Sequence, residues 1–196
     1  MDTVTIKNIL QTTYPFLETK DIDILLSISQ YQLLKNKVPI IKAGTTNQKF
    51  FFILSGMVRG YYINNKGEEK NIFLRPEYTA SGPPDTLFQK TKTKYTFESI
   101  LESHLLVFDY PKFLHISGLH PNLNKMHLAA LQENLQTVLF RVESLIDKLP
   151  EERYEDLLQR SPQFFQTAFN KHIANYLGIT PNSLSRILKR RKESKT

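Results

Sequence analysis

The sequence contains no cysteine and no long apolar run. The absence of cysteine excludes disulfides, thiolate zinc sites, iron–sulfur clusters and cysteine nucleophiles. No stretch reaches the roughly 18 consecutive apolar residues that a membrane span requires. The first seven residues have neither the basic start nor the apolar run of a signal peptide. We therefore expect a cytoplasmic protein that has no membrane partner.

Motifs typical of enzymes and of metal sites are also missing. There is no glycine-rich phosphate loop, no G-x-S-x-G elbow and no close pair of carboxylates, so we do not expect an enzyme. The histidines show neither H-x-H nor H-x₃-H spacing, so we expect no metal and no required cofactor. The five histidines are His104, His115, His120, His127 and His172.

Positive charge is concentrated at the C-terminal end of the chain. The formal net charge is +7. Residues 171–196 contain seven basic residues against the single acidic residue Glu193, which accounts for +6 of that total. Such a segment is typical of a surface that binds a polyanion such as DNA. A basic tail kept for solubility is the alternative, and charge alone does not decide between the two.

The middle of the chain, from about residue 31 to residue 110, has the pattern of short strands separated by turns. An apolar run over 49–54 is followed by an aromatic segment over 57–63, and Asn64–Gly67 predicts a turn after it. Residues 96–110 predict two further strands. Strands at this spacing favour a closed or double-layered β structure such as a jelly roll.

Helices are predicted on both sides of this region. Residues 1–30 are helical in pattern, with Thr19 as a cap. Between Pro121 and Pro150, apolar residues recur at alternating spacings of three and four, which is the a/d repeat of a coiled coil. The repeat predicts a parallel homodimer, and the alternative is a helix packed wholly within its own subunit. The seam residues, which form the predicted dimer interface, are Leu128, Leu131, Leu135, Val138, Val142, Leu145 and Leu149.

Residues 170–190 have the pattern of a helix-turn-helix. Ala174 is small at the point where two helices would cross, and Gly178 supplies a turn residue that tolerates positive φ. Thr180 then caps the second helix, and Pro181 takes its first position, where a missing N–H costs nothing. An ordinary helical hairpin with a solvated basic face is the alternative.

The second helix would present a polar and basic face to the major groove of duplex DNA. Asn182 suits a bidentate pair with adenine, and Arg186 suits one with guanine. Ser183, Ser185 and Lys189 suit phosphate or water-mediated contacts. The predicted DNA-binding residues are Thr180, Asn182, Ser183, Ser185, Arg186, Lys189 and Arg190.

In this order, the β region, the long helix and the C-terminal helix-turn-helix resemble the Crp/Fnr family of transcription regulators. The resemblance covers nearly the whole chain. It is most specific over residues 52–59 (FILSGMVR), and over 173–181 (IANYLGITP) together with 184–187 (LSRI). In relatives, the recognition helix opens with a base-contacting Arg/Glu pair and has an Arg four positions after the Glu. Here Pro181-Asn182 replaces the pair, while Arg186 matches.

The resemblance implies an α+β chain of three parts. These are a cyclic nucleotide-binding-like β-roll or jelly-roll sensor domain over residues 1–119, a dimerisation helix over 120–149 and a winged helix-turn-helix domain over 150–196. It also implies a homodimer bound to a two-fold symmetric, palindromic operator, with RNA polymerase as a candidate further partner.

Relatives that bind cyclic AMP hold its phosphate with a Gly-Glu pair that opens a short helix and with an Arg followed by a small residue. Counting back from residues 105–108 places these positions near Ala80-Ser81 and Lys94, where neither element is present. Pro83-Pro84 also removes two backbone amides. We therefore expect that standard cyclic AMP binding has been lost, and the effector is unknown. The candidate residues of an altered pocket are Ser81, Lys94, Arg75 and Glu77.

Two functions from different classes remain. The first is a sequence-specific DNA-binding transcription regulator. The second is a nucleotide-sensing or protein-interaction module whose C-terminal helices dock a partner protein rather than DNA. The basic C-terminal segment favours the first, because a protein-docking surface does not need so lopsided a charge.

Overall fold

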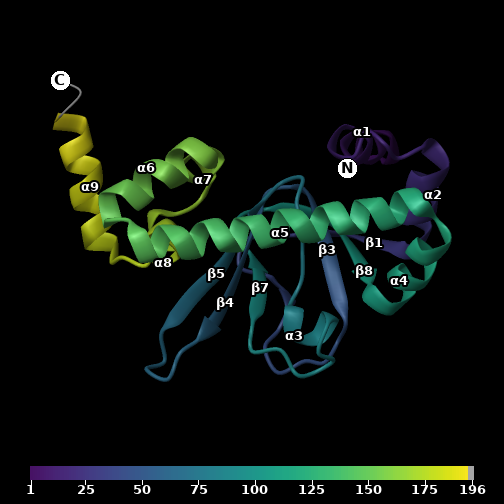
Figure 1. Ribbon diagram of the computed structural model, residues 1–196, viewed down its shortest axis with the longest axis horizontal. Helices are drawn as coiled ribbons and strands as arrows, with labels where there is room; N and C mark the ends of the chain where they lie inside the picture. Colours follow the sequence, from purple (N-terminus) through teal and green to yellow (C-terminus); the bar gives the residue numbers. More distant parts are fainter. Residues whose placement is uncertain (194–196) are drawn as a thin grey trace.

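The computed structural model describes residues 1–193, the side chain of residue 167 excepted. Two helices come first, and strands that form the β-roll follow (Figure 1). A short helix, α3, lies between β6 and β7. The bounds are α1 (Thr3–Thr13), α2 (Thr19–Ile28), β1 (Ser29–Leu34), β2 (Pro39–Ile41), β3 (Lys49–Ser55), β4 (Met57–Ile63), β5 (Glu69–Pro76), β6 (Ala80–Ser81), α3 (Pro84–Leu87), β7 (Thr96–Ser99) and β8 (Ser103–Asp109).

The strands form two antiparallel four-stranded sheets, with the orders β1-β8-β3-β6 and β2-β7-β4-β5. This alternation of neighbours between two facing sheets is the arrangement of a jelly roll. The expected turn after β4 is present, and Gly67 takes a φ of 77° there. The prediction of a double-layered β structure is confirmed.

Aromatic rings fill the interior of the β-roll. Phe97 stacks on Phe73 at 5.5 Å between ring centroids and meets Phe51 edge-on at 5.6 Å. Phe51 and Phe97 are fully buried. A Cβ at Gly60 would come within 2.7 Å of the Phe97 ring and 2.8 Å of the Phe73 ring, so the backbone of β4 also lies directly against them. The interior is therefore closely packed with protein side chains.

The N-terminal helices pack on the outside of this roll. Their buried residues Ile6, Leu10 and Leu25 belong to one core cluster with Leu123 and Met126 of the long helix. The predicted cap at Thr19 is wrong by one residue. Glu18 is the N-cap of α2, and it forms a capping box with Asp21, whose carboxylate accepts the backbone N–H of Glu18 at 2.9 Å.

Helix α4 (Tyr110–Leu119) leads into the long helix α5 (Pro121–Asp147), which runs from the N-terminal helices to the C-terminal helices. The prediction that Leu149 belongs to this helix is wrong. The helix ends at Asp147, and Leu149 is extended, with φ −67° and ψ 158°. The physical reason is Pro150, because the residue before a proline is disfavoured in the helical region.

The C-terminal part of the described chain is helical. It consists of α6 (Pro150–Arg160), α7 (Gln163–Thr167), α8 (Asn170–Tyr176) and α9 (Pro181–Glu193). Between residues 110 and 193 there is no strand, so the wing implied by the family resemblance is absent from the described chain. Among residues 1–193, we find no helix with the length and apolar character needed to cross a membrane.

Candidate nucleic-acid interface

Helices α8 and α9 form the predicted helix-turn-helix. Gly178 has a φ of 70° in the turn, which a residue with a side chain adopts only at a cost. A Cβ there would also lie 3.3 Å from Leu145, so the turn passes close to α5. Ala174 is fully buried where the two helices meet. The small residues therefore stand where the sequence pattern requires them.

The start of α9 is fixed by the predicted cap. The Thr180 hydroxyl accepts the backbone N–H of Ser183 at 3.1 Å, and the two hydroxyls are 3.0 Å apart. The Thr180 carbonyl accepts the N–H of Leu184 at 3.1 Å, and Pro181 takes the first helical position. Thr180 and Ser183 therefore serve first to hold the N-terminal turn of α9 in place.

Helix α9 has one buried and one exposed face. Leu184 and Ile187 are buried against α6 and α8. The opposite face carries polar and basic side chains, and its predicted DNA-binding residues are exposed. Figure 1 shows α9 at the end of the molecule farthest from the N-terminal helices. The exposed side chains of this face are Asn182, Ser185, Arg186 and Lys189.

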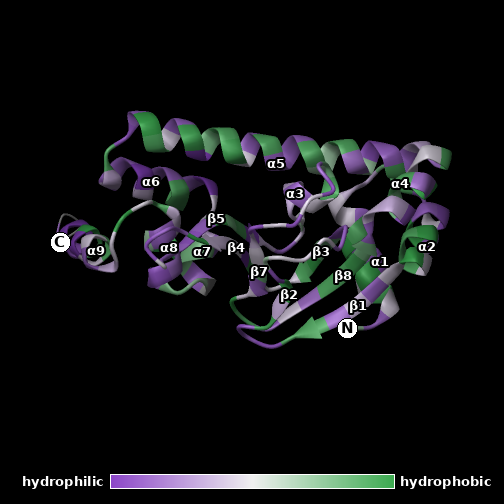
Figure 2. Ribbon diagram, turned by 90° about the horizontal axis from the view of Figure 1, so that it is seen from below, coloured by the Kyte–Doolittle hydropathy of each residue, from purple (hydrophilic) through white to green (hydrophobic). Residues whose placement is uncertain are grey.

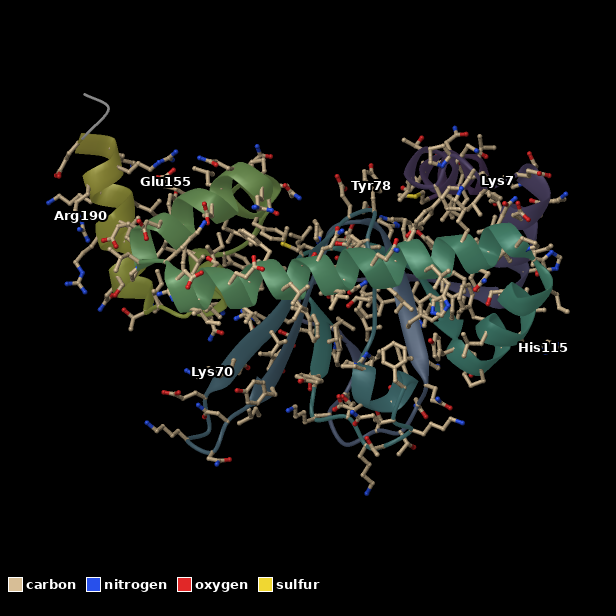
Figure 3. The ribbon with its side chains drawn as sticks, in the orientation of Figure 1. Lys7, Lys70, Tyr78, His115, Glu155 and Arg190 are labelled. Carbon is tan, nitrogen blue, oxygen red and sulfur yellow. The ribbon has the colours of Figure 1, made fainter. Side chains whose placement is uncertain are left out.

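Arg190 forms an ion pair with another helix, whereas Lys189 pairs with Glu193 of α9 itself. The guanidinium of Arg190 pairs with Glu151 of α6 at 2.9 Å, and the neighbouring Arg191 pairs with Glu155 at 2.8 Å. Figure 3 shows Arg190 and Glu155 on these adjacent helices. Arg190 therefore helps to hold α9 on α6, and its charge is partly neutralised. These ion pairs could not be predicted from the sequence, because the acidic partners lie about 40 residues away.

The helix-turn-helix is joined to the β-roll through Asn175. Its side-chain oxygen accepts the backbone N–H of Asn71 at 2.6 Å, and its amide donates to the carbonyl of Glu69 at 2.7 Å. In return, the Asn71 amide donates to the carbonyl of His172 at 3.1 Å. Helix α8 thus extends the hydrogen bonding of β5. Sequence reasoning missed these residues.

Arg141 of α5 completes this junction. Its guanidinium donates to the carbonyls of Asn71 (2.8 Å), Ile72 (2.7 Å) and Tyr176 (3.1 Å), and it lies over the Tyr176 ring at 4.2 Å. Burial lowers the pKa of Arg141, although an arginine stays protonated at neutral pH. One buried cation therefore ties together the long helix, β5 and α8.

His172 lies in the same junction, and its neutral form is favoured there. Burial lowers its pKa from 6.5 to about 4, and the nearby positive charges of Arg59 and Lys171 act in the same direction. In the unfolded chain the imidazole takes up a proton near pH 6.5, well before it does so in the folded chain. The unfolded state thus binds more protons between about pH 6.5 and pH 4, so acid pH destabilises the fold through this residue.

We expect the free energy of unfolding to fall by up to roughly 2 kcal/mol between about pH 7.5 and pH 5 because of His172 alone. Urea titrations at several pH values measure it. His172→Gln should flatten this part of the pH dependence. His127→Gln is the comparison variant. Burial also lowers the pKa of His127, which lies in a different part of the fold, so this change should flatten the pH dependence too, but less than His172→Gln, because the shift at His172 is the large one. Equal slopes for wild type and His172→Gln would contradict the assignment.

The four candidate ligand residues do not share one cavity. Arg75 and Glu77 line a cavity of about 480 Å³ between β5, α5, α6 and α7, and Ser81 and Lys94 are not among its lining residues. Ser81 is buried on β6, and Lys94 is exposed, with its ammonium 5.3 Å from the centre of the Tyr95 ring. The candidate set is therefore not one site, because only Arg75 and Glu77 lie together.

The short helix after β6 begins at Pro84, not near Ala80-Ser81. The expected cassette position near Ala80-Ser81 therefore lies on β6, before this helix, and Gly82 is the glycine that precedes the helix. A Cβ at Gly82 would come within 3.1 Å of the Lys49 carbonyl, so the backbone is closely approached here by the protein itself. The residue that follows is Pro83, which has no N–H to offer a phosphate.

The predicted dimer seam is exposed in the single chain. Leu135 is 59% exposed and Val138 is 40% exposed, and all seven seam residues belong to the exposed large hydrophobic side chains. Figure 2 shows α5 along one side of the molecule, with the β-roll and the C-terminal helices all on its other side. Isolated exposed leucines are ordinary, but a continuous row of them along one helix is typical of an interaction surface.

Metal binding finds no support in the described residues. Among residues 1–193, no group of three or more His, Asp or Glu side chains is arranged to hold a metal ion.

No family model matches the chain, and no curated protein matches it. Its fold nevertheless has clear counterparts among solved structures. FixK2 from Bradyrhizobium japonicum matches with a TM-score of 0.73 at 15% identity, over 86% of this chain and 86% of that one. CLP from Xanthomonas campestris, described as a c-di-GMP responsive global regulator, matches with a TM-score of 0.72 at 12% identity, over 91% and 93%.

A protein of Eubacterium rectale described as a transcriptional regulator of the crp/fnr family matches with a TM-score of 0.68 at 15% identity. The match covers 93% of this chain and 88% of that one. At such low identities the likeness establishes the fold. The chain has the Crp/Fnr cyclic-nucleotide-binding fold, with a β-roll followed by a helical C-terminal part.

Proposed function

We propose that the chain is a sequence-specific, DNA-binding transcription regulator of the Crp/Fnr type. The observation that carries this proposal is the exposed face of α9. Asn182, Arg186 and Lys189 are exposed on it, while Leu184 and Ile187 anchor the other face. A helix with this division fits the major groove, where side chains of its first turns contact base edges.

Within this proposal, Asn182 pairs with adenine and Arg186 with guanine, and Ser185 and Lys189 contact phosphates. Thr180 and Ser183 hold the start of α9 through their hydrogen bond. Because Pro181-Asn182 stands where the family has its Arg/Glu pair, the preferred base at that position differs from that of the family.

We propose further that two copies bind together through the exposed seam of α5. A dimer gives two α9 helices related by a two-fold axis, which explains why such proteins bind palindromic sites with half-sites about one helical turn apart. RNA polymerase remains a candidate further partner. The protein-docking alternative is not favoured, because a protein surface does not require the positive charge gathered at this end of the chain.

The β-roll of this regulator does not bind cyclic AMP in the standard way. Its interior is filled by Phe51, Phe73 and Phe97, and proline stands at the point where a phosphate cradle needs a backbone donor. Ser81 and Lys94 do not form a substitute cradle, since Ser81 is buried on β6 and Lys94 is exposed in the loop before β7.

Selection of bound duplexes from a random pool, followed by gel shift at two salt concentrations, tests the proposal. We expect a palindromic consensus and an affinity that falls steeply with salt, as phosphate contacts require. Micromolar binding to every duplex, with no consensus, would instead support the protein-docking alternative.

A further inference from the structure

The cavity of about 480 Å³ lies at the junction of the β-roll, the long helix and the C-terminal helices. We call it the interdomain cavity. Its walls come from the end of β5 and the loop after it, from the middle of α5, and from α6, α7 and the end of α8. Figure 1 shows these elements around the middle of α5. A molecule bound here would touch all three parts of the chain at once.

One side of the interdomain cavity is apolar and largely aromatic. Leu157 and Phe164 come from the C-terminal helices, Phe140 from α5, Tyr176 from α8 and Leu74 from β5. Aromatic walls of this kind favour a ligand with an apolar, flat body, which buries surface against them.

Arg75 lines the cavity as a buried and incompletely bonded cation. Only 2% of it is exposed. One terminal nitrogen donates to the carbonyl of Ala80 at 3.2 Å and pairs with the carboxylate of Glu133. Its Nε is buried without a hydrogen-bond partner. A buried donor left unpaired costs about 1–3 kcal/mol, so it points to an acceptor that arrives from outside the chain.

Two further donors line the same cavity. Tyr176 is 6% exposed, and no hydrogen bond of its hydroxyl is found in the described part of the chain. Arg160 is exposed at the end of α6 and lies over the Phe140 ring at 3.8 Å. Residues 1–193 contain no carboxylate within ion-pair distance of Arg160, in contrast to Arg190 and Arg191. The lining therefore offers donors to a ligand, next to the carboxylates of Glu77 and Glu133.

The lining carries two arginines and two glutamates, Glu77 and Glu133, so its formal charge is balanced. A monoanion is the largest negative charge that such a site accommodates without strong repulsion, which disfavours a phosphate dianion. A carboxylate supplies acceptors in the planar geometry that guanidinium groups bind best.

The dimer seam does not cover this cavity. Glu133, Thr137 and Phe140 follow one another at spacings of four and three, so they share one face of α5. At about 100° per residue, the seam residues Leu135 and Val138 lie on nearly the opposite face. The cavity therefore stays open when two α5 helices pair.

We propose that the interdomain cavity binds a small aromatic monocarboxylate, whose carboxylate meets Arg160 and the free Nε of Arg75 and whose ring lies against Phe140, Phe164 and Tyr176. As a ligand of all three parts of the chain, it fixes the position of the helix-turn-helix relative to the β-roll. Its role as the effector rests on the proposed DNA-binding function, whereas the binding itself does not.

Calorimetric titration of the full chain with benzoate, 3-phenylpropionate and indole-3-acetate tests the binding. We expect saturable heat for at least one acid and at least a tenfold weaker response to the matching neutral amide. Arg160→Gln should weaken binding by about tenfold or more, and it leaves the buried Arg75 in place. Arg186→Ala on the exposed face of α9 is the control and should bind as wild type does. Cyclic AMP should give no saturable heat.

No saturable heat with any of the three acids overturns the proposal, as does equal binding of acid and amide. Wild-type affinity of Arg160→Gln overturns it too, because the ion pair with the ligand is then missing. Gel shift with and without the acid reports separately on DNA. If the acid binds as expected but no duplex is selected, the proposed DNA-binding function is wrong, whereas the proposed ligand of the interdomain cavity is confirmed.

Discussion

Changing Leu135 and Val138 to glutamate together is expected to make the protein monomeric and to weaken its binding to a palindromic duplex by about 10²–10⁴-fold. Both side chains are exposed in the single chain, so the change should leave the fold of each subunit intact. In a coiled coil these positions face the partner, and four buried carboxylates would repel one another there. The loss in DNA affinity arises because the second half-site is then no longer bound at a high effective concentration.

Analytical ultracentrifugation measures the oligomeric state, and gel shift on the selected palindrome measures the loss. Gln132→Glu is the control, because it adds one carboxylate per chain, half the charge of the double variant, to an exposed position of α5 outside the seam. It should remain a dimer. A wild-type protein that is already monomeric at tens of micromolar would show that the row of exposed apolar residues has another partner.

The parts of the fold that depend on local sequence could be predicted from it. The strands, the turn at Gly67 and the turn at Gly178 follow from alternation and from positions that need positive φ. The helix-turn-helix could be found in the same way. Its small residue, its cap and its proline lie within eight residues of one another, and each has a distinct physical role.

The contacts that join the parts of the chain could not be predicted. Asn175 bonds to Glu69 and Asn71, which are more than 100 residues away, and Arg141 bonds to carbonyls about 70 residues away. No local period marks such residues, because a backbone carbonyl is available at every position. Arg141 lies in the predicted helix between Phe140 and Val142, and nothing in this local sequence shows which carbonyls it meets.

The same limit explains why the ion pair of Arg190 could not be predicted. On a helical wheel, Arg186 and Arg190 are four residues apart and share a face. Only the position of α6 separates them, since Glu151 lies beside Arg190 at 2.9 Å and no ion pair of Arg186 is found among residues 1–193. The end of α5 two residues before Leu149 has a local reason instead, because Pro150 disfavours the helical conformation of the residue before it.

Arg186 and Arg190 should therefore contribute differently to DNA binding, because Arg190 pairs with Glu151 and no ion pair of Arg186 is found among residues 1–193. Arg186→Ala should weaken binding to the selected duplex by about 5- to 150-fold, the range expected for losing one bidentate contact to guanine. It should also relax the preference for one base pair in each half-site. Arg190→Ala should weaken binding to all duplexes by a smaller and uniform factor, because Glu151 already neutralises part of its charge.

Gel shift on the selected duplex and on single-base variants of it separates these outcomes, and thermal denaturation checks that both variants fold. Arg190→Ala breaks a contact with α6 and should lower the stability slightly, whereas Arg186→Ala should not. A larger loss of base preference for Arg190→Ala than for Arg186→Ala would show that α9 meets DNA with a different face. Unchanged affinity for Arg186→Ala would exclude a role of Arg186 in the major groove. No ion pair of Arg186 is found among residues 1–193, so the variant loses no such contact within the protein that could mask the effect on DNA binding.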